Sequence, residues 1–95
     1  MIIHMVLLKL RFGVDIDGLA KEIDAMAQKI PDILSISIGG NVSPEDLDKG
    51  FNFGFVVNFK DVIARDSYLQ HPEHLNVAKQ IESAMEDIIV FDILT

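Results

Sequence analysis

The chain has no cysteine among its 95 residues and only eight basic side chains. The missing thiols exclude disulfides, thiolate metal ligands and cysteine nucleophiles. The lysines and arginines are spread thinly among fifteen acidic residues, and the formal net charge is −7. Because a phosphate backbone is bound by clustered basic side chains, neither nucleic acid nor an anionic membrane is an expected partner.

Long hydrophobic runs are also missing from the chain. The longest segment without a charged side chain, residues 33–44, is far shorter than the roughly 20 apolar residues of a membrane-spanning helix. The N-terminus has no basic segment before its apolar residues and no small-residue cleavage site, which argues against a signal peptide. We therefore expect a cytoplasmic protein that forms one domain over residues 1–95.

What the chain does have is an excess of apolar residues. Hydrophobic residues make up 49% of it and its mean hydropathy is +0.31, which is high for a small monomer that must cover its surface with polar groups. A chain of this length also buries a comparatively small share of its surface when it folds. Both properties predict self-association.

Four segments show the alternation that is typical of β-strands: residues 2–10, 33–42, 51–59 and 88–94. The first strand is apolar on both faces, with Ile3, Met5 and Leu7 opposite the face that carries His4. In the third strand, every second residue is a phenylalanine or a valine. That row is expected to form the core face against the helices.

Two segments have apolar residues at helical spacing. Residues 16–30 form the first, and either Asp15 or Asp17 can cap it. The second covers residues 61–85, where Pro72 interrupts the pattern because proline has no N–H to donate inside a helix. Both segments are predicted to be amphipathic helices.

The order strand, helix, strand, strand, helix, strand predicts an α+β, ferredoxin-like βαββαβ fold, in which a four-stranded antiparallel sheet has two helices on one face. The link at residues 43–50 is expected to contain a short helical turn, because a capping serine precedes Pro44. The second face of the sheet would be apolar and uncovered. Two such sheets packed face to face in a symmetric homodimer would bury it.

All three histidines of the chain belong to one constellation, which joins His4 in the first strand to the segment Tyr68-x-x-His71-Pro-x-His74. As an enzyme site, it would use His74 as general base, since an imidazole can remove a proton next to a carbonyl near neutral pH. Tyr68 would orient that ring, and His4 would polarise the carbonyl oxygen. His71, Met26, Phe53 and Phe55 would complete a binding pocket with largely apolar walls.

The same residues also have structural interpretations. His71 can precede a helix restart with Pro72 at its first position, and His4 can be a core histidine bonded to Tyr68 or to the backbone. A metal held by His4, His71 and His74 is a further alternative, but Pro72 separates the last two, and we expect no metal or other cofactor. Asp92 in the last strand is predicted to pair with Lys9 or Arg11, either across the sheet or between subunits.

Five segments in fixed order carry a resemblance to a known family: Ile3–Leu10, Gly39–Ser43, Gly50–Phe59, Tyr68–His74 and Val90–Asp92. They resemble the stress-responsive A/B barrel (Dabb) family of the dimeric α+β barrel superfamily. The resemblance covers almost the entire chain and implies a homodimer in which two sheets form a barrel with the helices outside.

The resemblance also bears on the site. A plant polyketide cyclase of this kind is similar at its strand histidine, which matches His4, at a tyrosine that matches Tyr68, and at histidines that match His71 and His74. That enzyme carries a further pocket tyrosine on its first helix, where the corresponding stretch of this chain offers Met26. The resemblance thus implies a pocket, with or without the cyclase reaction.

Three hypotheses for function follow. The first is a dimeric domain that binds a small apolar or carbonyl-containing molecule in a His/Tyr pocket. The second is a cofactor-free polyketide cyclase-like or lyase enzyme with His74 as the base. The third is a non-catalytic structural assembly protein, which needs only the dimer face and binds no ligand.

Overall fold

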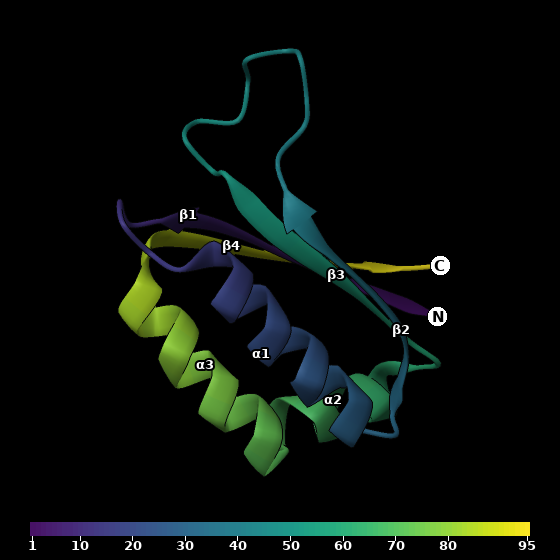
Figure 1. Ribbon diagram of the computed structural model, residues 1–95. Helices are drawn as coiled ribbons and strands as arrows, with labels where there is room; N and C mark the ends of the chain where they lie inside the picture. The colour runs from purple at the N-terminus through teal and green to yellow at the C-terminus, as the bar shows by residue number, and fades with distance from the viewer.

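The computed structural model describes all residues from 1 to 95, and they form four strands and three helices. In chain order these are β1 (Ile2–Leu10), α1 (Ile16–Lys29), β2 (Ile33–Gly40), β3 (Phe53–Phe59), α2 (Val62–Gln70), α3 (Pro72–Ala84) and β4 (Met85–Leu94). The sheet is antiparallel throughout, with strand order β2-β3-β1-β4. All three helices lie on one face of it (Figure 1). The predicted α+β, ferredoxin-like fold is confirmed.

The helices begin where the sequence offers caps. The Asp15 carboxylate accepts from the Gly18 N–H at the start of α1, and the Asp61 carboxylate accepts from the Ala64 N–H at the start of α2. The second predicted helix is two helices, because proline disfavours helical geometry at the residue before it and His71 is extended there. Helix α3 then passes directly into β4 at Met85, which was expected in the helix.

The link between β2 and β3 contains no helical turn, contrary to the prediction from Pro44. Its backbone instead uses left-handed conformations at Asp46 and Lys49, which an α-helical turn cannot accommodate. A hydrogen bond from the Asn41 amide to the Asp48 carboxylate braces the link. Residues 41–52, which we call the arm, project from the sheet as the loop at the top of Figure 1.

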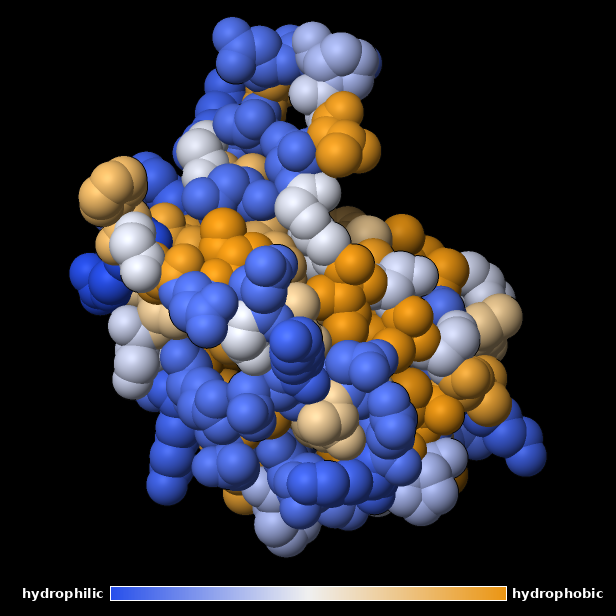
Figure 2. Space-filling model, viewed as in Figure 1, coloured by the Kyte–Doolittle hydropathy of each residue, from blue (hydrophilic) through white to orange (hydrophobic).

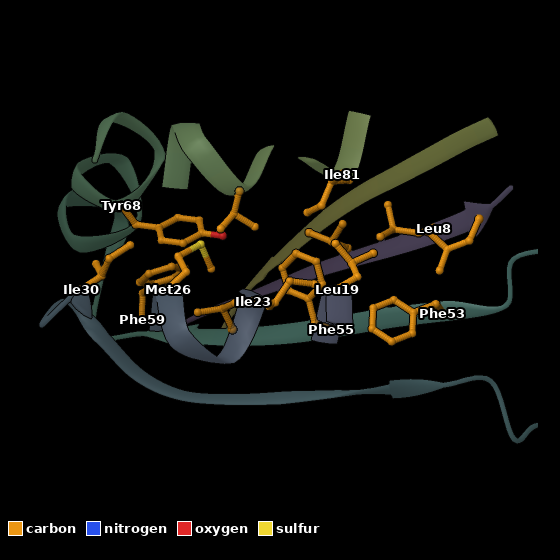
Figure 3. Close-up of a cluster of buried hydrophobic side chains, with 14 of the residues drawn as sticks. Leu8, Leu19, Ile23, Met26, Ile30, Phe53, Phe55, Phe59, Tyr68 and Ile81 are labelled. Carbon is orange, nitrogen blue, oxygen red and sulfur yellow. The ribbon is translucent and has the colours of Figure 1, made fainter. Parts of the chain in front are cut away.

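The core lies between the helices and the sheet. The predicted phenylalanine face is buried along β3, and the helix-facing side chains of β1 pack beside it. Figure 3 shows Leu19, Ile23 and Met26 of α1 reaching toward these strands. Each such side chain stabilises the fold by about 1.5–3 kcal/mol when it is fully buried. No helix is both long and apolar enough to cross a membrane.

The opposite face of the sheet has no helix over it, and we call it the open face. Cross-strand partners lie on the same face, and on this one Ile3 faces Ile93, Met5 faces Phe91 and Leu7 faces Ile89. These side chains are half-buried or exposed, and Phe91 keeps 58% of its surface accessible. In Figure 2, hydrophilic side chains cover much of the surface over the helices.

Candidate functional site

A cavity of about 360 Å³ lies on the helix side of the sheet, beside α3 and the edge strand β4. Most of its lining is apolar, and its polar side chains are His4, Tyr68, His74 and Glu82. Ring-to-ring contacts join the first three: the Tyr68 ring lies 5.7 Å from the His4 ring and 4.3 Å from the His74 ring. These three groups meet near the start of α3, whereas Glu82 lies two turns further along that helix.

Tyr68 is the central member of this group. It comes from the last turn of α2 and its residue surface is only 1% exposed. No protein group hydrogen-bonds the Tyr68 hydroxyl. Every side-chain oxygen or nitrogen that is fully buried does have a partner, so the Tyr68 oxygen is not fully buried and retains access to solvent. Burial raises the pKa of Tyr68 well above its usual value, and the neutral phenol is therefore a hydrogen-bond donor.

His74 has one ring nitrogen occupied. Its Nδ1 lies 3.0 Å from the Leu69 carbonyl oxygen, which can only accept, so Nδ1 carries the hydrogen and Nε2 keeps a lone pair. Burial lowers the pKa of His74, with nearby His4 and His71 acting in the same direction, while the hydrogen bond to Leu69 opposes the shift. Near neutral pH the ring is therefore an uncharged hydrogen-bond acceptor.

His4 is held by an acidic side chain. Its Nδ1 lies 2.6 Å from Asp92 Oδ1, and the β1–β4 register places the two residues directly opposite each other. The other Asp92 oxygen accepts from Arg65 of α2 at 2.9 Å. Within the subunit, Asp92 does not pair with Lys9 or Arg11, because Lys9 lies on the open face, where it approaches Glu86 at 3.8 Å. Pairing of Asp92 between subunits stays a prediction.

The sequence interpretation missed Arg65. The available signal was Asp92 itself, since a carboxylate in an otherwise apolar strand needs a partner. Finding that partner requires the β1–β4 register and the placement of α2 over the sheet, and neither can be read from residue spacing. His4 was expected to bond to Tyr68 or to the backbone, but its hydrogen bond goes to Asp92, and it meets Tyr68 in a ring contact.

The other predicted pocket residues divide into two groups. Met26 and Phe55 line the cavity, and Figure 3 shows Met26 directly below the Tyr68 ring. Phe53 lies two residues along β3 from Phe55, about 7 Å away, and does not line this cavity. His71 is also outside it, because its Nδ1 accepts from the Glu73 N–H at 3.1 Å and caps α3. No three metal-ligating side chains lie together.

The polar side chains of the cavity decide which kind of molecule it can bind. One end of an apolar cavity offers a phenol hydroxyl, a neutral imidazole with a free nitrogen, and a second imidazole backed by a carboxylate. Such a cavity can hold a small molecule by its apolar body and orient it by one polar head group. Its imidazoles can also accept and return protons.

Comparison with known proteins identifies the family of the chain. The family model described as stress responsive A/B barrel domain matches residues 2–94. No curated protein matches the chain. A protein of Arabidopsis thaliana has a similar structure, with a TM-score of 0.92, 24% identity, and coverage of 100% of this chain and 95% of that one.

Two further solved structures are similar. Hydroxynitrile lyase from Passiflora edulis has a TM-score of 0.90 and 21% identity over 99% of this chain and 92% of that one. A dimeric protein of unknown function with a ferredoxin-like fold, from Bacteroides fragilis NCTC 9343, has a TM-score of 0.81 and 26% identity over 99% and 95%. At identities of 21% and 24%, the plant structures establish the fold alone.

Proposed function

Because this chain belongs to the stress responsive A/B barrel domain family, we propose that it is a homodimeric protein that binds a small, mostly apolar molecule in the cavity beside α3. The observation that carries the proposal is the Tyr68 hydroxyl. A phenol in a buried side chain normally has a hydrogen-bond partner, and this one lies at the cavity with none from the protein. A ligand head group would supply that partner.

The ligand class follows from the lining. Apolar side chains dominate the walls, and the polar groups gather at one end, so the ligand has an apolar body and one polar head such as a carbonyl or a hydroxyl. The only acidic side chain in the lining, Glu82, lies away from that end. It disfavours a ligand with a second, anionic end.

The homodimer is proposed through the open face. Half-buried and exposed apolar side chains run along β1 and β4 there, and a soluble monomer rarely leaves such a contiguous patch uncovered. A second copy is the occupant that fits, because similar structures such as that from Bacteroides fragilis are described as dimeric. The cytoplasmic, single-domain character expected from the sequence remains part of this proposal.

A second candidate function is a cofactor-free lyase or cyclase reaction on a carbonyl compound. It is favoured by the free Nε2 of His74, which could take a proton from the carbon next to the carbonyl group. The Tyr68 hydroxyl would then donate to the developing enolate oxygen. Similarity to a hydroxynitrile lyase supports this candidate only at the level of the fold.

An NMR titration with 4-phenyl-2-butanone, an uncharged aromatic ketone, tests the binding proposal. We expect saturable shifts of amides around the cavity, with weaker binding in His74→Gln and unchanged binding in Lys79→Gln, whose side chain is exposed on α3. Absence of any saturable shift, with this ketone and with the matching alcohol, would favour the structural assembly hypothesis.

The same samples test for proton abstraction. In deuterated buffer, a general base at His74 would exchange the hydrogens next to the carbonyl for deuterium, and His74→Gln would slow that exchange to the buffer rate. Binding without any catalysed exchange would leave a binding protein and remove the enzyme candidate for ketones of this kind.

A further inference from the structure

A chain of three side chains backs the polar end of the cavity. Arg65 from α2 donates to Asp92 of β4 at 2.9 Å, and Asp92 contacts His4 Nδ1 of β1 at 2.6 Å. The Arg65 guanidinium is also fixed by Asp66, which accepts from its Nε at 3.0 Å. Residues from three elements therefore fix the orientation of the His4 imidazole ring.

The carboxylate in the middle of this chain is an obligatory acceptor. Partial burial alone would raise the pKa of Asp92, but hydrogen bonds from Arg65 and His4 outweigh it and hold the pKa below its usual value. An ionised carboxylate has no hydrogen to donate. The hydrogen between Asp92 and His4 therefore belongs to Nδ1 of the ring.

We propose that Asp92 and Arg65 are positioning residues that hold neutral His4 as the Nδ1–H tautomer, so that its Nε2 lone pair is available to a ligand in the cavity. Arg65 is needed because Asp92 lies on an edge strand, where its side chain is 24% exposed and would otherwise be free to rotate. A guanidinium that donates to two carboxylates at once fixes that rotamer.

The proposed tautomer of His4 also specifies the polar head group of the ligand, and this second part of the inference rests on the proposed function. Both imidazoles of the cavity donate their Nδ1–H to a protein oxygen: His74 donates to the Leu69 carbonyl and His4 to the Asp92 carboxylate. Each ring keeps a lone pair on Nε2. The polar end thus has two acceptors beside the Tyr68 hydroxyl. A head group that donates a hydrogen bond, such as an alcohol or an enol, satisfies them better than a bare ketone.

The decisive variant is Asp92→Asn. Arginine can only donate, so the introduced amide turns its oxygen toward Arg65 and its NH₂ group toward His4 Nδ1. That ring nitrogen must then accept, and the hydrogen moves to Nε2. Replacing a carboxylate behind a histidine by an amide is known to leave geometry intact while selecting the other tautomer. Asp66→Asn is the matched control, because Asp66 contacts Arg65 but not His4.

Nitrogen-15 NMR of the imidazole ring reads the tautomer directly, at a pH above the ring's own titration. We expect an unprotonated Nε2 for His4 in the wild-type protein and in Asp66→Asn, and a shift of that resonance to the protonated range in Asp92→Asn. A protonated Nε2 in the neutral wild-type ring would overturn the proposal. So would an unchanged Nε2 resonance in a folded Asp92→Asn protein.

Ligand preference is measured separately with 4-phenyl-2-butanol and 4-phenyl-2-butanone. The wild-type protein should bind the alcohol about 3- to 10-fold more tightly, as expected for one additional hydrogen bond, and Asp92→Asn should reduce or reverse that ratio. Equal affinities in the wild-type protein would overturn the inferred head group. Failure of both compounds to bind would count against the proposed function, and the tautomer result would still decide the role of Asp92.

Discussion

Tyr68 combines almost complete burial with a hydroxyl that no protein group satisfies. Its aromatic ring is part of the core, where it packs against Phe59 at 5.0 Å and against His74. The ring therefore contributes to stability, whereas the oxygen is available for a ligand. These two roles can be separated by removing the oxygen alone.

We predict that Tyr68→Phe leaves the free energy of unfolding within about 0.5 kcal/mol of the wild-type value, because no intramolecular hydrogen bond is lost. Ligand binding should weaken about 3- to 10-fold, as expected for one hydrogen bond of about 0.5–1.5 kcal/mol. Urea unfolding and the NMR titration measure the two effects. A large loss of stability with unchanged binding would assign the hydroxyl to the fold.

His74 makes stability depend on pH. Burial lowers its pKa, so between that lowered value and the ordinary histidine pKa of about 6.5, the unfolded chain binds a proton that the folded chain does not. The stability linked to the neutral ring is therefore present above about pH 6.5 and is lost as the pH falls through the folded-state pKa.

The corresponding prediction concerns His74→Gln, which cannot titrate. Its free energy of unfolding should fall less than that of the wild-type protein between about pH 7.5 and pH 5. Urea unfolding at one fixed protein concentration measures the difference at each pH. Parallel losses in the two proteins would show that His74 has the same pKa in both states.

At the scale of elements, the sequence predicts most of the architecture. Strand alternation and helical spacing are local properties, and β1, β3 and α1 lie where they were expected, within two residues at their ends. The link at residues 43–50 was mispredicted because Pro44 is equally compatible with a helix start and with a turn. The left-handed residues that decide between them, Asp46 and Lys49, leave no local signature.

The site was predictable to the extent that its residues share a local motif. Tyr68 and His74 lie near each other because the break at Pro72 folds α3 back beside the end of α2. The role of Asp92 depended on strand register and on an arginine from another element. Long-range pairings of that kind are set by the packed structure, so sequence spacing alone could not identify them.

The start of α3 gives a prediction for His71. Its Nδ1 accepts from the Glu73 N–H, which satisfies one of the free donors at the helix start. His71→Ala should therefore destabilise the protein by about 1 kcal/mol, whereas His71→Asn, which can cap in the same way, should retain most of the stability.

Urea unfolding measures both variants, and the NMR titration shows whether the cavity is affected. Because His71 does not line the cavity, binding should be unchanged in a folded His71→Ala protein. Weaker binding in that variant at full stability would instead place His71 in the site.

At the scale of the molecule, one half of the open face protrudes and the other half is hollow. Its β1–β4 half carries the large side chains Met5, Ile89 and Phe91, whereas its β2–β3 half has Gly39 opposite Gly54. A hollow of about 550 Å³ lies over those glycines, between the sheet and the arm. In a twofold dimer each contact occurs twice, so the bulky half of one copy can fill the hollow half of the other.

Gly39→Val tests this arrangement without disturbing the monomer. A Cβ at Gly39 would have no atom within 4 Å, and valine favours strands, so the isolated subunit should keep its stability. In the dimer the added side chain would occupy the hollow twice, at a cost of about 1–3 kcal/mol per site, and dissociation should become about 30-fold easier or more.

Sedimentation equilibrium measures the dimer dissociation constant, and circular dichroism confirms the fold. Gly40→Val is the matched control, since Gly40 is the next residue of the same strand and its side chain would point to the helix side, within ordinary contact distance of the Asn52 carbonyl oxygen. Dimerisation unchanged in Gly39→Val, or weakened equally in both variants, would mean that the hollow does not receive the second copy. The excess of apolar residues would then need a different partner surface.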